Sequence, residues 1–174
     1  MAHEEKLLKE IEKGDSSSLD ELVRMYYPDI LRYCLWHTYD RETAKDAAQE
    51  TFLKMVCHFD CYAHRGKFKA YLYKIAANVC TDMFRKKVYE PMPDDLPYSE
   101  IGFEKTESNE AFSSLIQNLT DGNREIMLLR FAQDLTVREI ADVVELPMRT
   151  VQSRLRSALK QIKKELKKGG ESLE

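Results

Sequence analysis

Apolar residues recur every three or four positions through most of this chain, which is the spacing of an amphipathic α-helix. In the first half the spacing predicts three helices, over about 19–35, 44–56 and 67–87. Asp40 precedes the second helix as a suitable N-cap, and Pro28 marks a boundary or a kink in the first. No alternation of polar and apolar residues indicates a strand, so the sequence predicts an all-α fold.

The second half continues the helical pattern in shorter segments. Two helices are expected over about 111–119 and 124–131, and turn residues ending at Gly122 should close the first of them. A longer helix follows from Pro147, a residue that suits the first turn of a helix. Its predicted buried stripe consists of Val151, Leu155, Leu159 and Ile162.

Composition divides the chain into two domains. Its 174 residues are 43% hydrophobic and 33% charged, with six Gly and five Pro, which is typical of a folded helical protein and excludes a disordered one. Segment 91–122 differs, because it holds one basic and seven acidic residues and three of the prolines. We therefore predict two small helical domains, 1–90 and 108–174, joined by a flexible acidic linker over 91–107. The second domain should contain a helix-turn-helix.

Cysteine content, hydropathy and charge bear on where the protein works. The four cysteines are too few for a disulfide framework, so we expect them to be reduced. The N-terminal residues lack the apolar core of a signal peptide, and no stretch is apolar enough for a membrane span. These features predict a cytoplasmic protein without membrane insertion. A net charge of −3 provides no global basic field, so any nucleic-acid contact must come from local patches.

Segment 136–168 has the features of a helix-turn-helix. Thr136 and Glu139 form a capping box, a turn follows at 145–146, and the next helix is strongly basic. Residues 148–168 include eight basic residues and a single acid. The N-terminal turns of such a helix reach base edges in the major groove, and trailing residues lie nearer phosphate. The expected DNA contacts are Arg149, Thr150, Gln152, Ser153, Arg154, Arg156 and Lys160.

The helix predicted over 67–87 carries a second candidate surface. Residues 65–87 hold seven basic residues and one acid, and the aromatic residues Phe68, Tyr73 and Phe84 are interleaved with them. Cations and rings together favour binding of unpaired nucleic acid, although rings at helical spacing are more often part of a core. A polar stripe beside the apolar one consists of Lys67, Tyr71, Lys74, Asn78, Thr81 and Arg85.

Three segments together resemble a known family. Segment 46–54, DAAQETFLK, resembles the core-polymerase-binding segment of bacterial sigma factors, and segment 68–85, FKAYLYKIAANVCTDMFR, resembles their promoter-melting helix. Segment 135–155, LTVREIADVVELPMRTVQSRL, is similar to their helix-turn-helix. The three occur in the family's order, and the short two-domain chain is similar to the extracytoplasmic-function (ECF) group of the sigma-70 family.

The resemblance implies a sigma factor, which is not an enzyme and uses no cofactor or metal. Such a protein binds core RNA polymerase, directs it to promoter DNA with −10 and −35 elements, and helps to open the duplex. In the family, one segment of the sigma factor docks on the beta-prime clamp of the polymerase. The residues that match this segment are Asp46, Gln49, Glu50 and Phe52. Those expected at the −10 element are Lys67, Asn78, Asp82 and Arg85, with Tyr71 and Lys74 on the same stripe. Whether an anti-sigma factor sequesters the chain is left open.

Two positions depart from the family pattern. Tyr71 stands where the family usually has Trp, so an aromatic surface is kept but its reach is shorter. Glu145 stands where Gly often closes the first helix of the motif. This substitution would cost about 1 kcal/mol if the position needs a left-handed backbone.

Other interpretations stay open from the sequence alone. A conventional repressor or activator would use the helix-turn-helix as a homodimer without polymerase, but no sensor or dimerisation segment is evident. A zinc or redox role for the cluster of Cys57, His58, Cys61 and His64 is a second alternative, although the spacing departs from common zinc motifs. The acidic linker is either a solvated tether or, by the resemblance, a nucleic-acid mimic in the RNA path of the polymerase.

Overall fold

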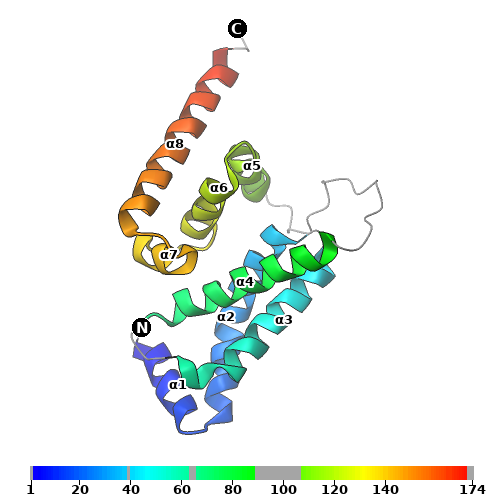
Figure 1. The fold of residues 1–174 in the computed structure, drawn as a ribbon, viewed down its shortest axis with the longest axis vertical. Coiled ribbons are helices and arrows are strands. Elements are labelled where there is room, and N and C mark those ends of the chain that lie inside the picture. Colours follow the sequence, from blue (N-terminus) through cyan, green and yellow to red (C-terminus); the bar gives the residue numbers. More distant parts are fainter. Residues whose placement is uncertain (1, 39, 63–65, 89–106, 172–174) are drawn as a thin grey trace. The chain divides into compact units, whose positions relative to one another are not determined.

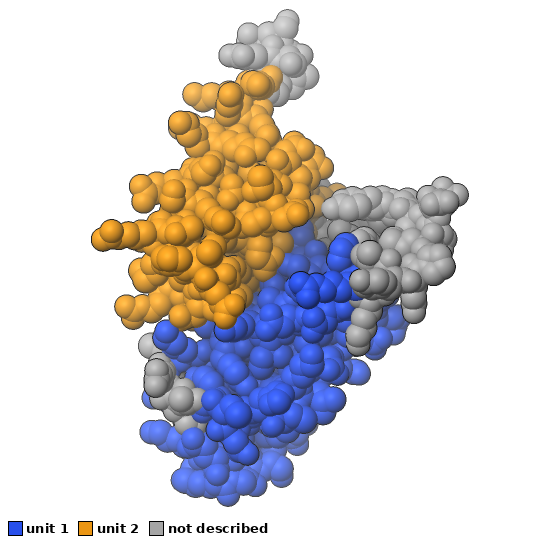
Figure 2. Space-filling view, viewed as in Figure 1, with its two compact units in different colours: residues 1–102 blue, residues 103–174 orange. Residues whose placement is uncertain are grey.

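The computed structural model describes residues 2–38, 40–62, 66–88 and 107–171. Within these ranges the chain forms eight α-helices, one 3-10 helix and one π-helix, with no strand (Figure 1), which confirms the all-α prediction. The chain divides into two compact units, residues 1–102 and 103–174 (Figure 2). The predicted linker lies outside the described residues except for Glu107, which begins a helix. No helix in the described part is both long and apolar enough to cross a bilayer.

Unit 1 is built from α1 (Ala2–Glu12), α2 (Ser16–His37), α3 (Arg41–Cys57), the 3-10 helix η1 (Phe59–Cys61) and α4 (Phe68–Val88). Helices α2, α3 and α4 pack against one another, and α1 packs against α2 (Figure 1). The largest fully buried side chains of this unit are Tyr33, Tyr73, Phe68, Leu22, Ile30, Met55 and Leu72.

Local signals fix the ends of the helices in unit 1. Asp40 accepts a hydrogen bond of 2.7 Å from the backbone N–H of Thr43, which confirms the predicted N-cap of α3. Pro28 lies inside α2 and does not end it. Tyr26 and Ile30 on either side of the proline are buried in the core, so tertiary packing holds the helix through a residue that lacks a backbone donor.

Helix α1 lies outside the helices that the sequence pattern predicts. Its charged residues leave only short apolar stretches, and an isolated helix of this length is marginal in water. Leu7 and Leu8 are nevertheless only 4% and 3% exposed, in a helix that packs on α2. Burial of a leucine contributes about 1.5 to 3 kcal/mol, so tertiary contact accounts for this element.

Unit 2 consists of α5 (Glu107–Ile116), α6 (Asp121–Met127), the π-helix η2 (Leu128–Ala132), α7 (Val137–Val144) and α8 (Met148–Glu171). Helices α6 and α7 both pack against the long helix α8. The buried side chains that hold the unit together include Ile116, Ile126, Leu129, Leu135, Ile140, Val151 and Ala158.

Three sequence-based details of unit 2 are wrong. Gly122 lies inside α6 and does not close α5. Leu159 is 46% exposed and Ala158 is buried in its place, because helical spacing alone does not separate two adjacent apolar residues. Pro147 lies one residue before α8 and not in its first turn. Its carbonyl oxygen accepts hydrogen bonds from the N–H groups of Thr150 and Val151 at 2.9 and 3.1 Å.

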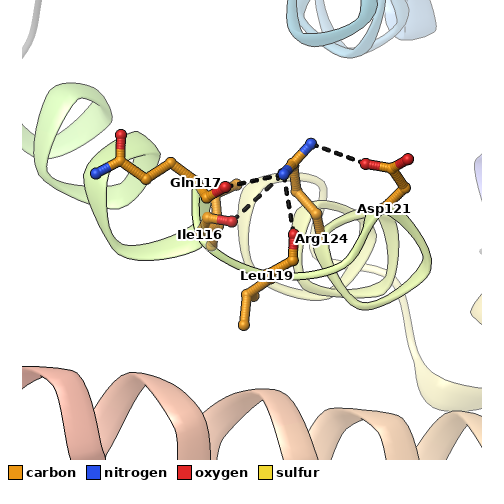
Figure 3. A network of polar contacts seen from close by, with 5 residues as sticks. All are labelled: Ile116, Gln117, Leu119, Asp121 and Arg124. Atoms are coloured by element: carbon orange, nitrogen blue, oxygen red, sulfur yellow. Dashed lines mark hydrogen bonds and ion pairs between the residues drawn. The ribbon is translucent and has the colours of Figure 1, made fainter.

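Arg124 of α6 fixes the turn after α5 (Figure 3). Its Nε donates to the carbonyl of Ile116 at 3.3 Å, and its Nη2 donates to the carbonyls of Gln117 and Leu119 at 2.9 Å each. Nη1 forms an ion pair of 3.2 Å with Asp121. The last carbonyls of a helix have no partner within the helix, so this guanidinium supplies the donors that the end of α5 needs.

Candidate nucleic-acid and polymerase interfaces

An open groove of about 650 Å³ lies on unit 1, between one face of α4 and the segment where α3 passes into η1. The α4 wall consists of Tyr71, Lys74, Ile75, Asn78, Thr81, Asp82 and Arg85. The facing residues are Lys54, His58 and Cys61. The structure therefore brings together every residue predicted for the −10 element except Lys67, which is exposed just before α4 and does not line the groove.

Three polar side chains of the groove wall are available to a ligand. Asn78, Asp82 and Arg85 are exposed on successive turns of α4, and none of them makes a hydrogen bond or ion pair within the described structure. Together they offer an amide, a carboxylate and a guanidinium. Lys54 and Lys74 add two further cations, so positive charge exceeds negative charge in the groove, as phosphate binding requires.

Tyr71 supplies the aromatic part of the groove. Its hydroxyl donates to the backbone carbonyl of His58 at 3.3 Å, and its ring lies 4.9 Å from that of Tyr62. Burial raises the pKa of the Tyr71 hydroxyl, and the neighbouring Cys61 adds to the rise. The hydroxyl is therefore a neutral donor at physiological pH, and its bond to His58 ties the half-buried ring of α4 to the facing side of the groove.

The other rings of α4 divide between core and surface. Phe68 and Tyr73 are 1% and 0% exposed, so they belong to the core and offer no surface to an unpaired base. Phe84 is 48% exposed and keeps its place among the candidate contacts. The interpretation of the interleaved rings as a base-stacking surface is thus restricted to Tyr71 and Phe84.

The outward face of α3 contains most of the predicted docking residues. Asp46 and Gln49 are exposed, and Glu50 is half-exposed with an ion pair of 3.7 Å to Lys54. Phe52 is only 7% exposed and stacks on Tyr27, with 6.0 Å between the ring centroids. Its helical position is that of the buried stripe, so Phe52 is removed from the docking surface and assigned to the core.

Two apolar residues of α3 complete the outward face. Leu53 is 59% exposed and Val56 is 42% exposed, at positions four and seven after Gln49. With Asp46 they follow a spacing of three, four and three residues, so all four side chains share one side of the helix. In the sequence, the sign of such a surface is an apolar residue, here Leu53 or Val56, at a helical position outside the buried stripe.

The helix-turn-helix has the local structure that the sequence predicts. The hydroxyl of Thr136 accepts from the N–H of Glu139 at 3.2 Å, and the Glu139 carboxylate accepts from the N–H of Thr136 at 2.7 Å. This confirms the capping box at the start of α7. Glu145 has φ 54° and ψ 41°, so the position that departs from glycine does adopt a left-handed backbone.

Helix α8 presents one exposed polar stripe. Thr150 and Arg154 are half-buried and lie beside this stripe, not on it. A Cβ atom added to Gly122 of α6 would lie 2.7 Å from Nη1 of Arg154, so this guanidinium is turned toward α6. The exposed members of the predicted −35 set are Arg149, Gln152, Ser153, Arg156 and Lys160.

The cysteines separate into a buried and an exposed pair, and all four thiols are free. A hydrogen bond with Cys80, together with burial, raises the pKa of Cys34, so the Cys34 thiol stays protonated in the core. Cys57 and Cys61 are exposed, while His64 lies outside the described residues. Within the described part of the chain, no three metal-ligating side chains gather at one point.

Two family models match the chain in the order that its two units follow. The Sigma-70 region 2 model matches residues 22–88, which include the α4 groove and the outward face of α3. The Sigma-70, region 4 model matches residues 109–162, which include the helix-turn-helix. The two matches together cover more than half of the chain and show a protein of the sigma-70 family with a region 2 and a region 4.

Relatives of similar length extend this assignment. The ECF RNA polymerase sigma factor SigM of Bacillus subtilis is 31% identical over 153 residues, covering 82% of this chain and 93% of the relative. The ECF RNA polymerase sigma factor SigW of the same organism is 25% identical over 179 residues, covering 93% and 96%. The chain belongs to the ECF group of the sigma-70 family, as its motifs predict.

Solved structures share the fold. CnrH, solved in complex with the cytosolic domain of CnrY, has a TM-score of 0.72 at 18% identity and covers 95% of this chain and 97% of its own. The sigma factor RpoE from Bartonella quintana, solved with the anti-sigma factor NepR, has a TM-score of 0.67 at 18% identity, covering 85% and 96%. At this identity the likeness concerns the fold alone.

Proposed function

We propose that the protein binds core RNA polymerase, directs it to promoters through −10 and −35 elements and promotes melting of the −10 region. The observation that carries this proposal is the groove on α4, where Asn78, Asp82 and Arg85 lie without internal partners beside the ring of Tyr71. A structural role would use such groups within the protein. Polar groups left available next to a ring are what an unpaired nucleotide requires.

Melting in this proposal is differential binding and needs no catalytic group. Lys54, Lys74 and Arg85 attract the phosphates of one strand, and Tyr71 offers part of its ring to a base. The amide of Asn78 is suited to pair with a base edge that is occupied in the duplex. The groove therefore favours the unpaired strand, which offsets an unstacking cost of a few kcal/mol.

Promoter recognition at the −35 element is assigned to the exposed stripe of α8. Arg149 lies in its first turn and Arg156 two turns later, within reach of base edges in a major groove. The capping box fixes where α7 begins, and the left-handed residue Glu145 ends it, so both set the orientation of α8. The half-buried Arg154 is assigned to a phosphate, because it lies off this stripe.

Core polymerase is the proposed partner of the outward face of α3. Asp46 and Gln49 provide polar contacts, and Leu53 and Val56 provide exposed apolar area beside them. A small apolar centre with a polar rim is the usual composition of a protein interface. An anti-sigma factor is a further proposed partner, since RpoE was solved in complex with one. We propose that the protein works in the cytoplasm.

Reconstitution with core polymerase tests the proposal against a regulator that acts alone. The full chain, core enzyme and a library of duplex promoters are combined, and the transcripts are sequenced. We expect transcripts from promoters with two shared elements only when the chain is present. Specific duplex binding by the chain as a homodimer, without any association with core enzyme, would instead establish the alternative regulator.

A further inference from the structure

Helix α1 begins before the Sigma-70 region 2 match, which starts at residue 22. Besides its buried leucines, it places the half-buried carboxylate of Glu4 against α2. The hydroxyl of Tyr26 on α2 donates to Glu4 Oε2, and Tyr26 is itself only 7% exposed. A second link at this end of α1 joins His3 to Glu21 of α2 at 2.7 Å.

Glu4 also lies close to the segment that follows η1. Burial raises the pKa of the Tyr62 hydroxyl, and the negative charge of Glu4 acts in the same direction. The carboxylate that accepts from Tyr26 on α2 therefore also acts electrostatically on the chain between η1 and α4.

A continuous set of ring contacts leads from this carboxylate to the groove. The ring of Tyr26 meets that of Phe68 edge-on at 5.5 Å, and Tyr62 meets Phe68 edge-on at the same distance. Tyr62 also lies 4.9 Å from Tyr71, the aromatic residue of the groove wall. Tyr71 in turn donates to the carbonyl of His58, which lines the facing side of the groove.

We propose that α1 is a positioning element for the groove on α4, acting through the hydrogen bond from Tyr26 to Glu4 and the ring contacts that join Tyr26 to Tyr71. This inference rests on the proposed function of the groove. Glu4 fixes Tyr26, the ring of Tyr26 supports Phe68, and Phe68 supports Tyr62. Tyr62 packs against the ring of Tyr71 and so limits the orientations that this ring can adopt toward a base. A binding site whose side chains are held in advance loses less conformational entropy when the ligand binds.

Removal of the Glu4 side chain provides the test, with a matched control on the same helix. Holoenzyme is assembled from the full chain and core polymerase, and its affinity for a labelled single-stranded −10 oligonucleotide is measured by fluorescence anisotropy. We expect Glu4→Ala to weaken this affinity about fivefold, the scale of one lost hydrogen bond. The control Glu5→Ala removes the same charge from an exposed position of α1 and should have no effect.

Further variants separate positioning from general stability. Glu4→Gln keeps an oxygen that accepts from Tyr26 and should recover most of the affinity. Tyr62→Phe keeps the ring contacts and should behave as wild type, whereas Tyr62→Ala should resemble Glu4→Ala. Binding of core polymerase and of −35 duplex should stay unchanged in all four variants.

Two results would overturn the inference. In one, Glu4→Ala and Tyr62→Ala bind the oligonucleotide as wild type does. In the other, both variants lose core-polymerase binding to the same degree, as expected of a purely structural helix. Failure of the proposed function can be told apart from failure of this inference. In that case the wild-type holoenzyme itself would show no preference for the unpaired −10 strand.

Discussion

Gly122 of α6 leaves space for Arg154 of α8. A Cβ atom at residue 122 would lie 2.7 Å from Nη1 of the arginine, closer than side-chain atoms approach one another. Arg154 makes no hydrogen bond or ion pair within the described structure, although it is half-buried. The absence of a side chain at Gly122 therefore leaves room for this guanidinium on the side of α8 that faces α6.

This placement predicts different effects for two arginines of α8. Arg149→Ala should cost about 1 to 3 kcal/mol and relax the preference at particular −35 positions, because Arg149 lies on the exposed stripe. Arg154→Ala should weaken all sequences alike and lower the salt slope by about one. Binding to a −35 library at several salt concentrations measures both. Lys164→Ala is the control for a phosphate contact, and a sequence-dependent loss with Arg154→Ala would refute the assignment.

The Arg124 network predicts a large stability effect without any DNA contact. Arg124→Met removes the donors to Ile116, Gln117 and Leu119 and should lower the free energy of unfolding by about 2 kcal/mol. Urea denaturation of the full chain, followed by circular dichroism, measures the change. Arg138→Met, at an exposed arginine of α7, is the matched control and should leave stability unchanged. Equal stability of the two variants would show that the network contributes nothing.

Helix α3 provides a test that separates core from surface at adjacent residues. Phe52→Ala should destabilise the protein by about 3 to 5 kcal/mol, because the ring is buried against Tyr27. Leu53→Asp should leave the melting temperature unchanged and weaken binding of core polymerase, as should Glu50→Arg. Calorimetry and a polymerase pull-down measure the two properties. Unchanged pull-down by folded Leu53→Asp and Glu50→Arg variants would exclude α3 as the docking face.

The left-handed residue at the end of α7 predicts a stabilising substitution. Glu145→Gly should raise the free energy of unfolding by up to about 1 kcal/mol, because glycine adopts φ 54° without steric cost. Glu145→Ala keeps the Cβ atom and should bring no such gain. Chemical denaturation compares the two. A loss of stability with glycine would show that contacts of the glutamate side chain outweigh the backbone term.

The sequence predicts well whatever depends on helical periodicity alone. Tyr71, Lys74, Asn78 and Arg85 line one wall of the groove because their spacing places them on one face of α4. Caps such as Asp40 are equally local, since donor and acceptor lie within one turn. These features require no knowledge of how the helices pack.

Features that depend on packing are the ones the pattern misses or misplaces. Helix α1 exists because α2 buries two of its leucines, and the facing wall of the groove forms only where His58 and Cys61 meet α4. Phe52 and Leu53 are adjacent and apolar, yet only the packed structure shows which of them is buried. A helical period assigns such neighbours to a face with an uncertainty of one residue.

Capture of the unpaired −10 strand by the groove is the central claim, and Asn78 is the residue that tests it without disturbing the fold. Asn78 is exposed and has no partner within the described structure, so Asn78→Ala removes only a group offered to the ligand. Its position on α4 leaves the proposed docking face of α3 intact, so the variant should still bind core polymerase.

The decisive measurement is permanganate footprinting of unpaired thymines with Asn78→Ala holoenzyme, on a duplex promoter and on the same promoter with a pre-melted −10 bubble. We predict lower reactivity and slower opening on the duplex, with incomplete recovery on the bubble, because the lost hydrogen bond is to the unpaired strand itself. Wild-type reactivity on the duplex promoter would contradict capture of the strand by this groove.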